Sequence, residues 1–188
     1  MVMTLKERLY RFRSFLIFPV LAFALLSLSF RAEPLRNRGD LLWLYVIGLF
    51  SWTLIEYGMH RFLFHVHLPF RSARLREIVN GSHLGHHASP RDATKVLVHP
   101  SFGIVVSLIL YGLLYATTGS VLSASAILVG IWTGFLYYES VHYRVHFSLS
   151  ASGLVAQQRR KHFYHHFTNN KRCFGVTTPL WDYVFRTR

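Results

Sequence analysis

The sequence has almost no cysteine and few acidic residues. Cys173 is its only cysteine, which excludes an intramolecular disulfide and argues against a thiolate metal site. Asp and Glu number 8 against 21 Lys and Arg, so the formal net charge is +13 with His neutral. Charged residues are only 15% of the chain and hydrophobic residues are 52%, which excludes a disordered chain. Basicity combined with long apolar runs favours a membrane surface over nucleic acid as the partner, and the sequence contains no RNA-binding signature.

Four stretches are apolar enough to cross a bilayer as helices. Each has about 17–19 residues, or roughly 26–28 Å as a helix, which is close to the thickness of the hydrocarbon core. They are 14–30, 41–59, 102–118 and 121–138. No small-residue cleavage site follows the first stretch, so we expect a membrane helix there rather than a signal peptide. Gly119 and Ser120 predict a tight turn that makes the last two spans a helical hairpin.

The basic residues predict the orientation of these spans. Of the 21 Lys and Arg, 18 lie before the first span, within 60–100 or after the last span. With four spans these three segments share one side, and the positive-inside rule makes that side cytoplasmic. We therefore expect residues 1–188 to form a single all-α integral membrane domain, in which 60–100 and 139–188 build a cytoplasmic helical cap.

Ten of the twelve histidines fall into four short clusters, all within the expected cap. The clusters are His60 and His65; His83, His86 and His87; His142 and His146; and His162, His165 and His166. Neutral imidazole is the commonest protein ligand for a redox-capable transition metal. One ion takes about four to six such groups, so ten of them predict a histidine-rich dimetal centre. The remaining two, His67 and His99, are interpreted as ordinary interfacial or loop residues.

The spacing of the clusters predicts where the ligands lie on their helices. HxxxH and HxxHH place imidazoles at i, i+3 and i+4, on one face of an α-helix. Five residues turn an α-helix by about 140°, so His65 is expected beyond the helix that carries His60. Pro69 is consistent with a bend of the chain there.

The ligand set favours iron. Catalytic zinc usually has three protein ligands and structural zinc four, often including cysteine. Ten histidines without cysteine suit two iron ions better, and redox chemistry would explain why there are two. Zinc can still occupy such a site in a purified sample, because its affinity for nitrogen ligands exceeds that of Fe(II).

Three acidic residues are candidates to orient the metal ligands through their second ring nitrogens. Glu56 precedes His60 by four residues, Glu139 precedes His142 by three, and Asp182 follows the last cluster. Metal-bound histidines usually donate their other N–H to a carboxylate or a carbonyl. The alternative for Glu56 and Glu139 is an ion pair with a nearby arginine, Arg61 or Arg144.

The clusters and the residues around them resemble the fatty acid hydroxylase/sterol desaturase superfamily of membrane di-iron enzymes, and fatty acid 2-hydroxylases most of all. The segments that carry the resemblance are EYGMHRFLFH at 56–65, GSHLGHHASPRD at 81–92, HFYHHF at 162–167 and FGVTTPLWD at 174–182. The resemblance implies that all ten clustered histidines hold the metals. It also implies O2-dependent di-iron hydroxylation of a lipid fatty acyl chain at the 2-position.

Two alternatives to this activity stay open. One is a sterol or carotenoid hydroxylase or desaturase of the same superfamily, and the other is a non-catalytic membrane metal carrier or sensor. A carrier needs polar groups along its spans, whereas these histidines lie outside them. Arg159, Arg160 and Lys161 are candidates to bind an anionic lipid head group, or they form a solvated basic face.

The resemblance also bears on the electron donor and the location. Eukaryotic members often carry a cytochrome b5 domain, for which this chain has no room. Electrons are therefore expected from a separate cytochrome b5- or ferredoxin-like protein, and the short chain favours a bacterial inner membrane over the endoplasmic reticulum.

Overall fold

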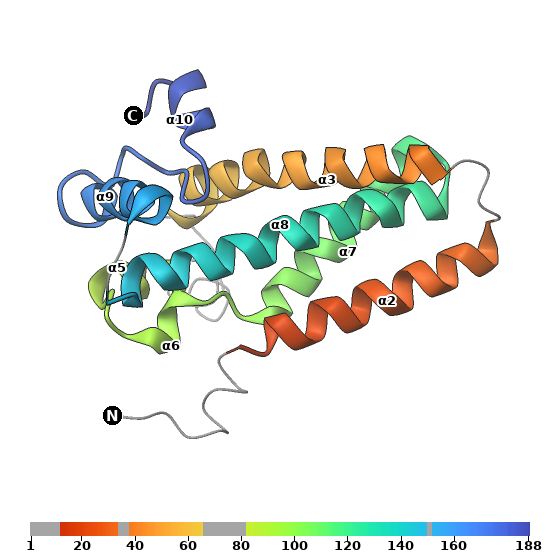
Figure 1. The fold of residues 1–188 in the computed structure, drawn as a ribbon, viewed down its shortest axis with the longest axis horizontal. Helices are drawn as coiled ribbons and strands as arrows, with labels where there is room; N and C mark the ends of the chain where they lie inside the picture. The colour runs from red at the N-terminus through yellow and green to blue at the C-terminus, as the bar shows by residue number, and fades with distance from the viewer. Residues whose placement is uncertain (1–11, 34–37, 66–81, 150–151) are drawn as a thin grey trace, which may run out of the picture. The chain divides into compact units, whose positions relative to one another are not determined.

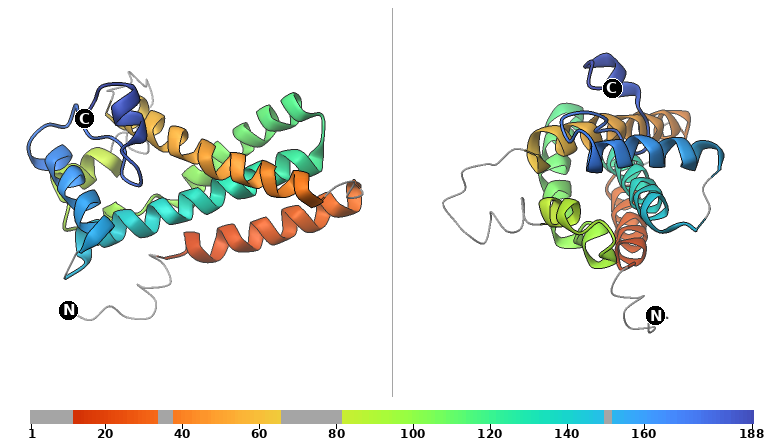
Figure 2. Two further views of the ribbon diagram at one scale, coloured as in Figure 1. Left: turned by 45° about the horizontal axis from the view of Figure 1, so that its top comes forward. Right: turned by 90° about the vertical axis from the view of Figure 1, so that its left-hand side faces the viewer.

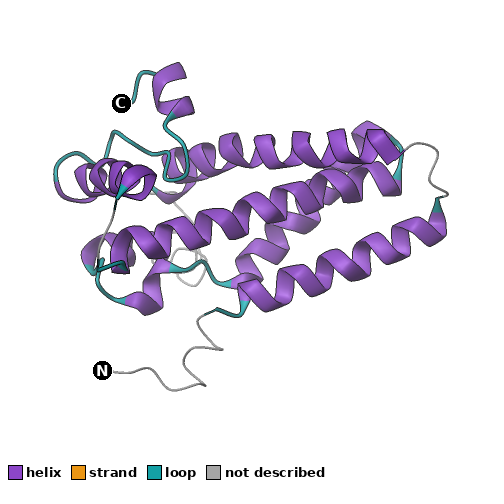
Figure 3. Cartoon of the chain, viewed as in Figure 1, coloured by secondary structure: helices purple, strands orange, loops and turns teal. Residues whose placement is uncertain are grey.

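The structure, a computed structural model, describes residues 12–33, 38–65, 82–149 and 152–188. All regular structure within these ranges is helical, which confirms the predicted all-α class (Figure 1; Figure 3). The long elements are α2 (Ser14–Ala32), α3 (Arg38–Gly58), which continues as a π-helix (Met59–Phe64), α7 (Pro100–Thr118) and α8 (Val121–Phe147). The shorter ones are α5 (Ser82–Ala88), α6 (Ala93–Val96), α9 (Gly153–Phe167) and α10 (Leu180–Val184).

Four helices are long and apolar enough to cross a membrane, as the sequence predicts. They are Ser14–Ala32, Asp40–Phe64, Pro100–Thr118 and Val121–Phe147. The first and third agree with the expected boundaries to within two residues. The helix that contains the fourth predicted span, α8, continues without a break past residue 138 to Phe147. His142 and His146 therefore belong to the same helix as the fourth span.

The described chain forms two compact units, each built from distant parts of the sequence. Unit 1 falls within Met1–Trp52 and His99–Leu136, and unit 2 within Thr53–Val98 and Tyr137–Arg188. In unit 1, the buried ring of Phe18 on α2 packs edge-on against Trp132 at 5.5 Å and Phe135 at 5.1 Å, both on α8. The Trp132 indole also donates a 2.7 Å hydrogen bond to Ser107 on α7. These contacts join α2 and α7 to α8.

Within unit 1, α3 and α8 approach each other so closely that their backbones touch at two glycines (Figure 2). A Cβ placed on Gly48 would collide with the carbonyl of Ile127, and one on Gly130 with the carbonyl of Tyr45. Small residues that let backbones approach are the usual device of helix packing in membranes, where van der Waals contact replaces the hydrophobic effect.

The turns between the helices of unit 1 are capped by polar groups. Gly119 ends α7 with φ +64°, and the predicted turn with Ser120 follows it. Glu33 accepts hydrogen bonds from the Ser120 hydroxyl and from the backbone N–H of Val121, which holds the pKa of Glu33 below its usual range. A carboxylate at this position also complements the positive end of the α8 dipole. His99 caps α7 by accepting from the backbone N–H of Ser101, so it has a local structural role.

In unit 2, α5, α9 and the final turns of α8 gather round the π-helix that ends α3 (Figure 2). These elements and His65, directly after the π-helix, contain all ten clustered histidines. The interpretations of Pro69 and His67 fall on residues outside the described ranges.

Candidate metal centre

The ten clustered histidines come together as two groups of five. In each group every residue offers one ring nitrogen, and these nitrogens all lie within 4.8 Å of one another. Group 1 is His60, His65, His83, His87 and His165. Group 2 is His86, His142, His146, His162 and His166. The sequence predicted the ten residues and two ions, and the structure adds the division between the two positions.

Each HxxHH motif supplies both groups. On α5, the i and i+4 residues His83 and His87 belong to group 1, with their Nε2 atoms 3.1 Å apart, while the i+3 residue His86 belongs to group 2. On α9, the i and i+4 residues His162 and His166 belong to group 2, while the i+3 residue His165 belongs to group 1. Residues i+3 and i+4 diverge by about 100° around an α-helix, so one helix reaches two neighbouring centres.

His60 and His65 meet through a π-helical turn. The π-helix Met59–Phe64 has i→i+5 hydrogen bonding, so residues five apart lie nearly above one another. The two rings are 5.0 Å apart, and both residues join group 1. The prediction that His65 lies just past the helix is confirmed, since the π-helix ends at Phe64. The 140° separation assumed for an α-helix is wrong here, and the five-residue spacing of two candidate ligands was the available signal.

Group 2 is assembled mainly from the end of α8 and from α9. The Nε2 atom of His162 lies 3.1 Å from that of His142, 2.8 Å from that of His146 and 2.9 Å from that of His166. His142, His162 and His86 are buried, and His146 and His166 are partly so. The four-residue spacings on both helices are what bring each pair to the same side.

Hydrogen bonds at Nδ1 of two group 1 histidines leave the lone pair of each ring on Nε2, where it can bind a metal ion. The Nδ1–H of His60 donates to the carbonyl of Phe174 at 2.5 Å, and that of His165 donates to the carbonyl of Arg172 at 2.6 Å. A carbonyl can only accept, so the Nε2 atom of each neutral ring carries a lone pair. The Nε2 atom of His60 is buried and has no hydrogen-bond partner among the described residues.

These distances fit a metal ion better than hydrogen bonding between rings. Two nitrogens that are each about 2.1 Å from a common ion, at right angles, lie about 3.0 Å apart. The Nε2–Nε2 distances in both groups, 2.8–3.1 Å, match that value. Five imidazoles with converging lone pairs repel one another unless a cation lies between them, so the donor set fits one transition-metal ion in each group.

The surroundings keep the imidazoles neutral, as metal binding requires. Burial, followed by repulsion from neighbouring rings, lowers the pKa of His86 to about 3 and the pKa values of His87 and His166 to about 2. Burial likewise lowers the pKa of His65 to about 4. Neutral rings offer lone pairs at neutral pH without first releasing a proton.

Glu56 and Asp182 bond to one loop rather than to a histidine ring. Glu56 accepts from the backbone N–H of Val176 at 2.6 Å and from the N–H and hydroxyl of Thr177 at 2.9 and 2.5 Å. Asp182 accepts from the N–H groups of Phe174 and Gly175, both at 2.9 Å. Both acids are buried. They therefore hold the stretch 172–177, called here the carbonyl loop, which presents its carbonyls to two group 1 histidines.

Glu56 and Glu139 bond to backbone N–H groups instead of the arginines that the sequence offered as alternative partners. Arg61 donates to the Tyr57 hydroxyl at 2.8 Å. Glu139 accepts from the backbone N–H of Val98 at 3.1 Å, which ties α8 to the segment before α7. The carbonyls of the loop are functional groups that sequence reasoning missed, because a backbone carbonyl has no residue signature.

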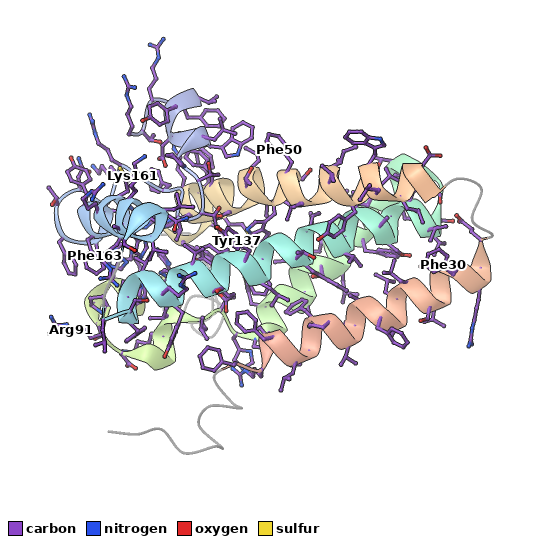
Figure 4. All side chains as sticks on the ribbon, viewed as in Figure 1. Phe30, Phe50, Arg91, Tyr137, Lys161 and Phe163 are labelled. Atoms are coloured by element: carbon purple, nitrogen blue, oxygen red, sulfur yellow. The ribbon has the colours of Figure 1, made fainter. Side chains whose placement is uncertain are left out.

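A cavity of about 450 Å³ borders group 2 at His146. Its lining combines a polar and charged segment after α5 with aromatic rings on α9. The lining residues are Ser89, Pro90, Arg91, Asp92, His146, Arg159, Phe163 and Phe167, of which Arg91 and Phe163 are labelled in Figure 4. Arg159, a predicted head-group ligand, donates to the carbonyls of Val145 and Ser148, so its guanidinium secures the end of α8.

Comparisons with known proteins found related sequences and a related structure. The family profile described as Fatty acid hydroxylase matches residues 45–187. Fatty acid 2-hydroxylase of Rattus norvegicus is 34% identical over 145 residues, which cover 77% of this chain and 39% of the rat protein. Dihydroceramide fatty acyl 2-hydroxylase FAH2 of Arabidopsis thaliana is 32% identical over 140 residues, covering 74% of this chain and 58% of the plant protein. The chain therefore spans well under two thirds of the length of these relatives.

A solved structure has the same fold. In the structure of full-length Scs7p only the hydroxylase domain is visible, and it matches 98% of this chain and 69% of its own with a TM-score of 0.80 at 26% identity. Ceramide very long chain fatty acid hydroxylase SCS7 of Saccharomyces cerevisiae is 31% identical to this chain over 159 residues, covering 81% of this chain and 40% of the yeast protein.

Proposed function

Because the chain belongs to the fatty acid hydroxylase family, we propose that it is a membrane enzyme that hydroxylates the acyl chain of a lipid at the 2-position. The observation that carries this proposal is the convergence of ten histidines into two groups of five. Named relatives hydroxylate fatty acids or the acyl chains of ceramides, which favours an acyl substrate over the sterol and carotenoid alternatives. A metal carrier is disfavoured, because the ring nitrogens form closed groups rather than a path.

Iron is the proposed metal, with one ion in each group. Two iron ions would supply the oxidation of an unactivated C–H bond by O2, which no protein side chain can perform alone. Two electrons per turnover would come from a separate cytochrome b5- or ferredoxin-like donor. Zinc in a purified sample would be a replacement, because nitrogen sites favour it over Fe(II).

The protein's own part in the reaction is to orient ligands and to position the substrate. The carbonyl loop fixes the Nδ1–H tautomer of His60 and His165, and Glu56 and Asp182 hold the loop in place. Glu56 and Asp182 are therefore proposed as positioning residues that act through backbone carbonyls. Glu139 is proposed to set the end of α8 by its bond to Val98.

The cavity beside His146 is the proposed position of the reacting end of the substrate. Carbon 2 of an acyl chain is bonded directly to the carbonyl carbon, so a 2-hydroxylase must hold the polar end of the lipid beside its metal centre. Ser89 and Arg91 can hydrogen-bond a carbonyl or hydroxyl, while Phe163 and Phe167 can pack against the first methylene groups.

The membrane orientation follows from charge. The segments 60–100 and 139–188 hold 14 of the 21 Lys and Arg, so we propose that the metal groups face the cytoplasm. Whether that membrane is a bacterial inner membrane, as the sequence favoured, or the endoplasmic reticulum stays a prediction.

The deciding experiment is comparative lipid mass spectrometry after expression in a host that lacks 2-hydroxylated lipids. We expect new 2-hydroxyacyl lipids with the natural sequence and none with a His165→Ala/His166→Ala variant, which removes one ligand from each group. Gln157→Ala, an exposed substitution on the same helix, is the matched control and should retain activity. Altered sterols or carotenoids with unchanged acyl chains would refute the acyl assignment.

A further inference from the structure

The short helix α10 attaches to the end of α3 by one face. The Trp181 indole donates a 2.9 Å hydrogen bond to the Thr53 hydroxyl, and the Phe185 ring stacks on Tyr57 with centroids 5.2 Å apart. Asp182, on the same helix, is buried and bonds to the carbonyl loop. These contacts lie within unit 2 and fix which side of α10 faces the protein.

The other side of α10 is apolar and exposed. Leu180, Tyr183 and Val184 are 40%, 53% and 56% exposed, and the neighbouring Phe185 is 46% exposed. A contiguous apolar surface of this kind marks contact with a membrane or another protein. The choice between these two partners depends on the charges and on the helix to which α10 is attached.

Cations surround this apolar surface. The Lys161 ammonium lies 5.4 Å and the Arg188 guanidinium 5.2 Å from the centre of the Tyr183 ring, and Arg186 is exposed beside them (Lys161 is labelled in Figure 4). Between residues 140 and 188 the sequence contains eight Lys and Arg and a single acid, the buried Asp182. An apolar surface with a basic rim complements a lipid leaflet that contains anionic head groups.

The position of α10 along α3 matches the depth of a membrane interface. Thr53 and Tyr57 both belong to the stretch Asp40–Phe64, one of the four helices able to span a bilayer. Arg61 is the first cation within that stretch, and at 1.5 Å per residue Tyr57 and Thr53 lie about 6 and 12 Å before it along the helix. Interfacial helices bury their apolar face about 5–10 Å into the boundary between head groups and acyl chains.

We infer that α10 and the residues after it form an interfacial membrane surface. Leu180, Tyr183 and Val184 insert among the upper acyl chains, and Lys161, Arg186 and Arg188 bind the phosphates of anionic phospholipids. This surface is independent of the proposed hydroxylation, and it would anchor the carbonyl loop, through Asp182, to the membrane interface.

The test is the accessibility of a spin label on the full chain in lipid nanodiscs of phosphatidylcholine and phosphatidylglycerol. In a Cys173→Ser background, a label at Val184→Cys should collide more often with O2 than with a water-soluble nickel chelate. A label at Asn170→Cys, an exposed turn residue after α9, should show the opposite preference. Equal exposure of both labels to the nickel chelate would overturn the inference, as would shielding of the Val184 label from both reagents, which would indicate a protein partner.

The basic rim is tested by the enrichment of labelled phosphatidylglycerol around the protein. Each cation near a membrane surface contributes about 1 kcal/mol, or roughly a fivefold preference. Arg186→Gln with Arg188→Gln should therefore lower the enrichment severalfold, whereas Lys171→Gln, an exposed substitution next to the reference site Asn170, should change it less. An unchanged enrichment in the double variant would contradict the lipid assignment even if the protein hydroxylates lipids normally.

Discussion

The carbonyl loop makes one of the two metal positions depend on Glu56. Glu56→Ala removes all three hydrogen bonds that the carboxylate accepts and leaves the buried N–H of Val176 unpaired, at a cost of about 1–3 kcal/mol, together with the partly buried N–H of Thr177. The loop should then relax and release the carbonyl of Phe174 from His60. The loss of such an orienting partner typically lowers metal affinity about 10–100-fold.

The expected result concerns group 1 alone, because both loop carbonyls bond to its members, His60 and His165. Titration of the metal-loaded protein with a chelator, followed by elemental analysis, should show two releases per chain. In Glu56→Ala one of them should occur at about 10–100-fold lower chelator activity, and the other should not move. Glu56→Gln, which keeps the shape of the side chain, should fall between this variant and the natural protein.

Glu139→Ala is the matched control, since Glu139 is also buried but bonds to Val98 instead of the loop. Glu139→Ala should lower the free energy of unfolding, but it should not shift one metal release relative to the other. The reasoning would be refuted if Glu56→Ala held both ions as tightly as the natural protein, or if Glu139→Ala lost the same ion to the same extent.

Three further predictions follow from other features. In metal-free protein, the folded imidazoles of His86 and His87 have pKa values near 3 and 2, so the unfolded chain binds more protons than the folded chain below about pH 6.5. The melting temperature in detergent should therefore be constant above pH 7.5 and fall steadily toward pH 4. A melting temperature that does not change with pH would contradict this prediction. Gly48→Val places side-chain atoms against an α8 carbonyl and should destabilise the protein by about 1–3 kcal/mol or more in unfolding assays, whereas Gly112→Ala, which meets open space, should not. Phe163→Ala should raise KM or broaden chain-length selectivity while metal content stays the same; loss of metal instead would show that the ring supports the metal centre rather than the cavity.

The sequence predicted the elements and the candidate ligands because both predictions rest on local patterns. Apolar runs of the right length predicted the four spans, and the spacings predicted all ten histidines. The division of each HxxHH motif between two groups could not be predicted, because it depends on how α5 and α9 are placed around their neighbours. The continuity of α8 from the fourth span to His146 could not be predicted from the apolar run, which ends at residue 138.

The partners of the acids needed three-dimensional information. Glu56 lies 120 residues from Val176, which donates to it, and nothing in the local sequence of either residue specifies that pairing. An apolar setting indicated only that the carboxylate must have a partner. The local sequence suggested a histidine ring as the partner of Glu56, with Arg61 as the alternative, whereas Arg61 donates to the hydroxyl of Tyr57.

The π-helical turn at Met59–Phe64 has a consequence for how the chain tolerates length changes. Because this turn holds one residue more than an α-helical turn, removing any single residue between His60 and His65 would restore ordinary helical phase. The new i, i+4 spacing would still leave the ligand pair on one face, because four residues of an α-helix and five of a π-helix bring the chain round to nearly the same side. A deletion in this turn should therefore disturb group 1 less than a deletion between His83 and His87, where the loss of one α-helical residue turns one ligand away by about 100°.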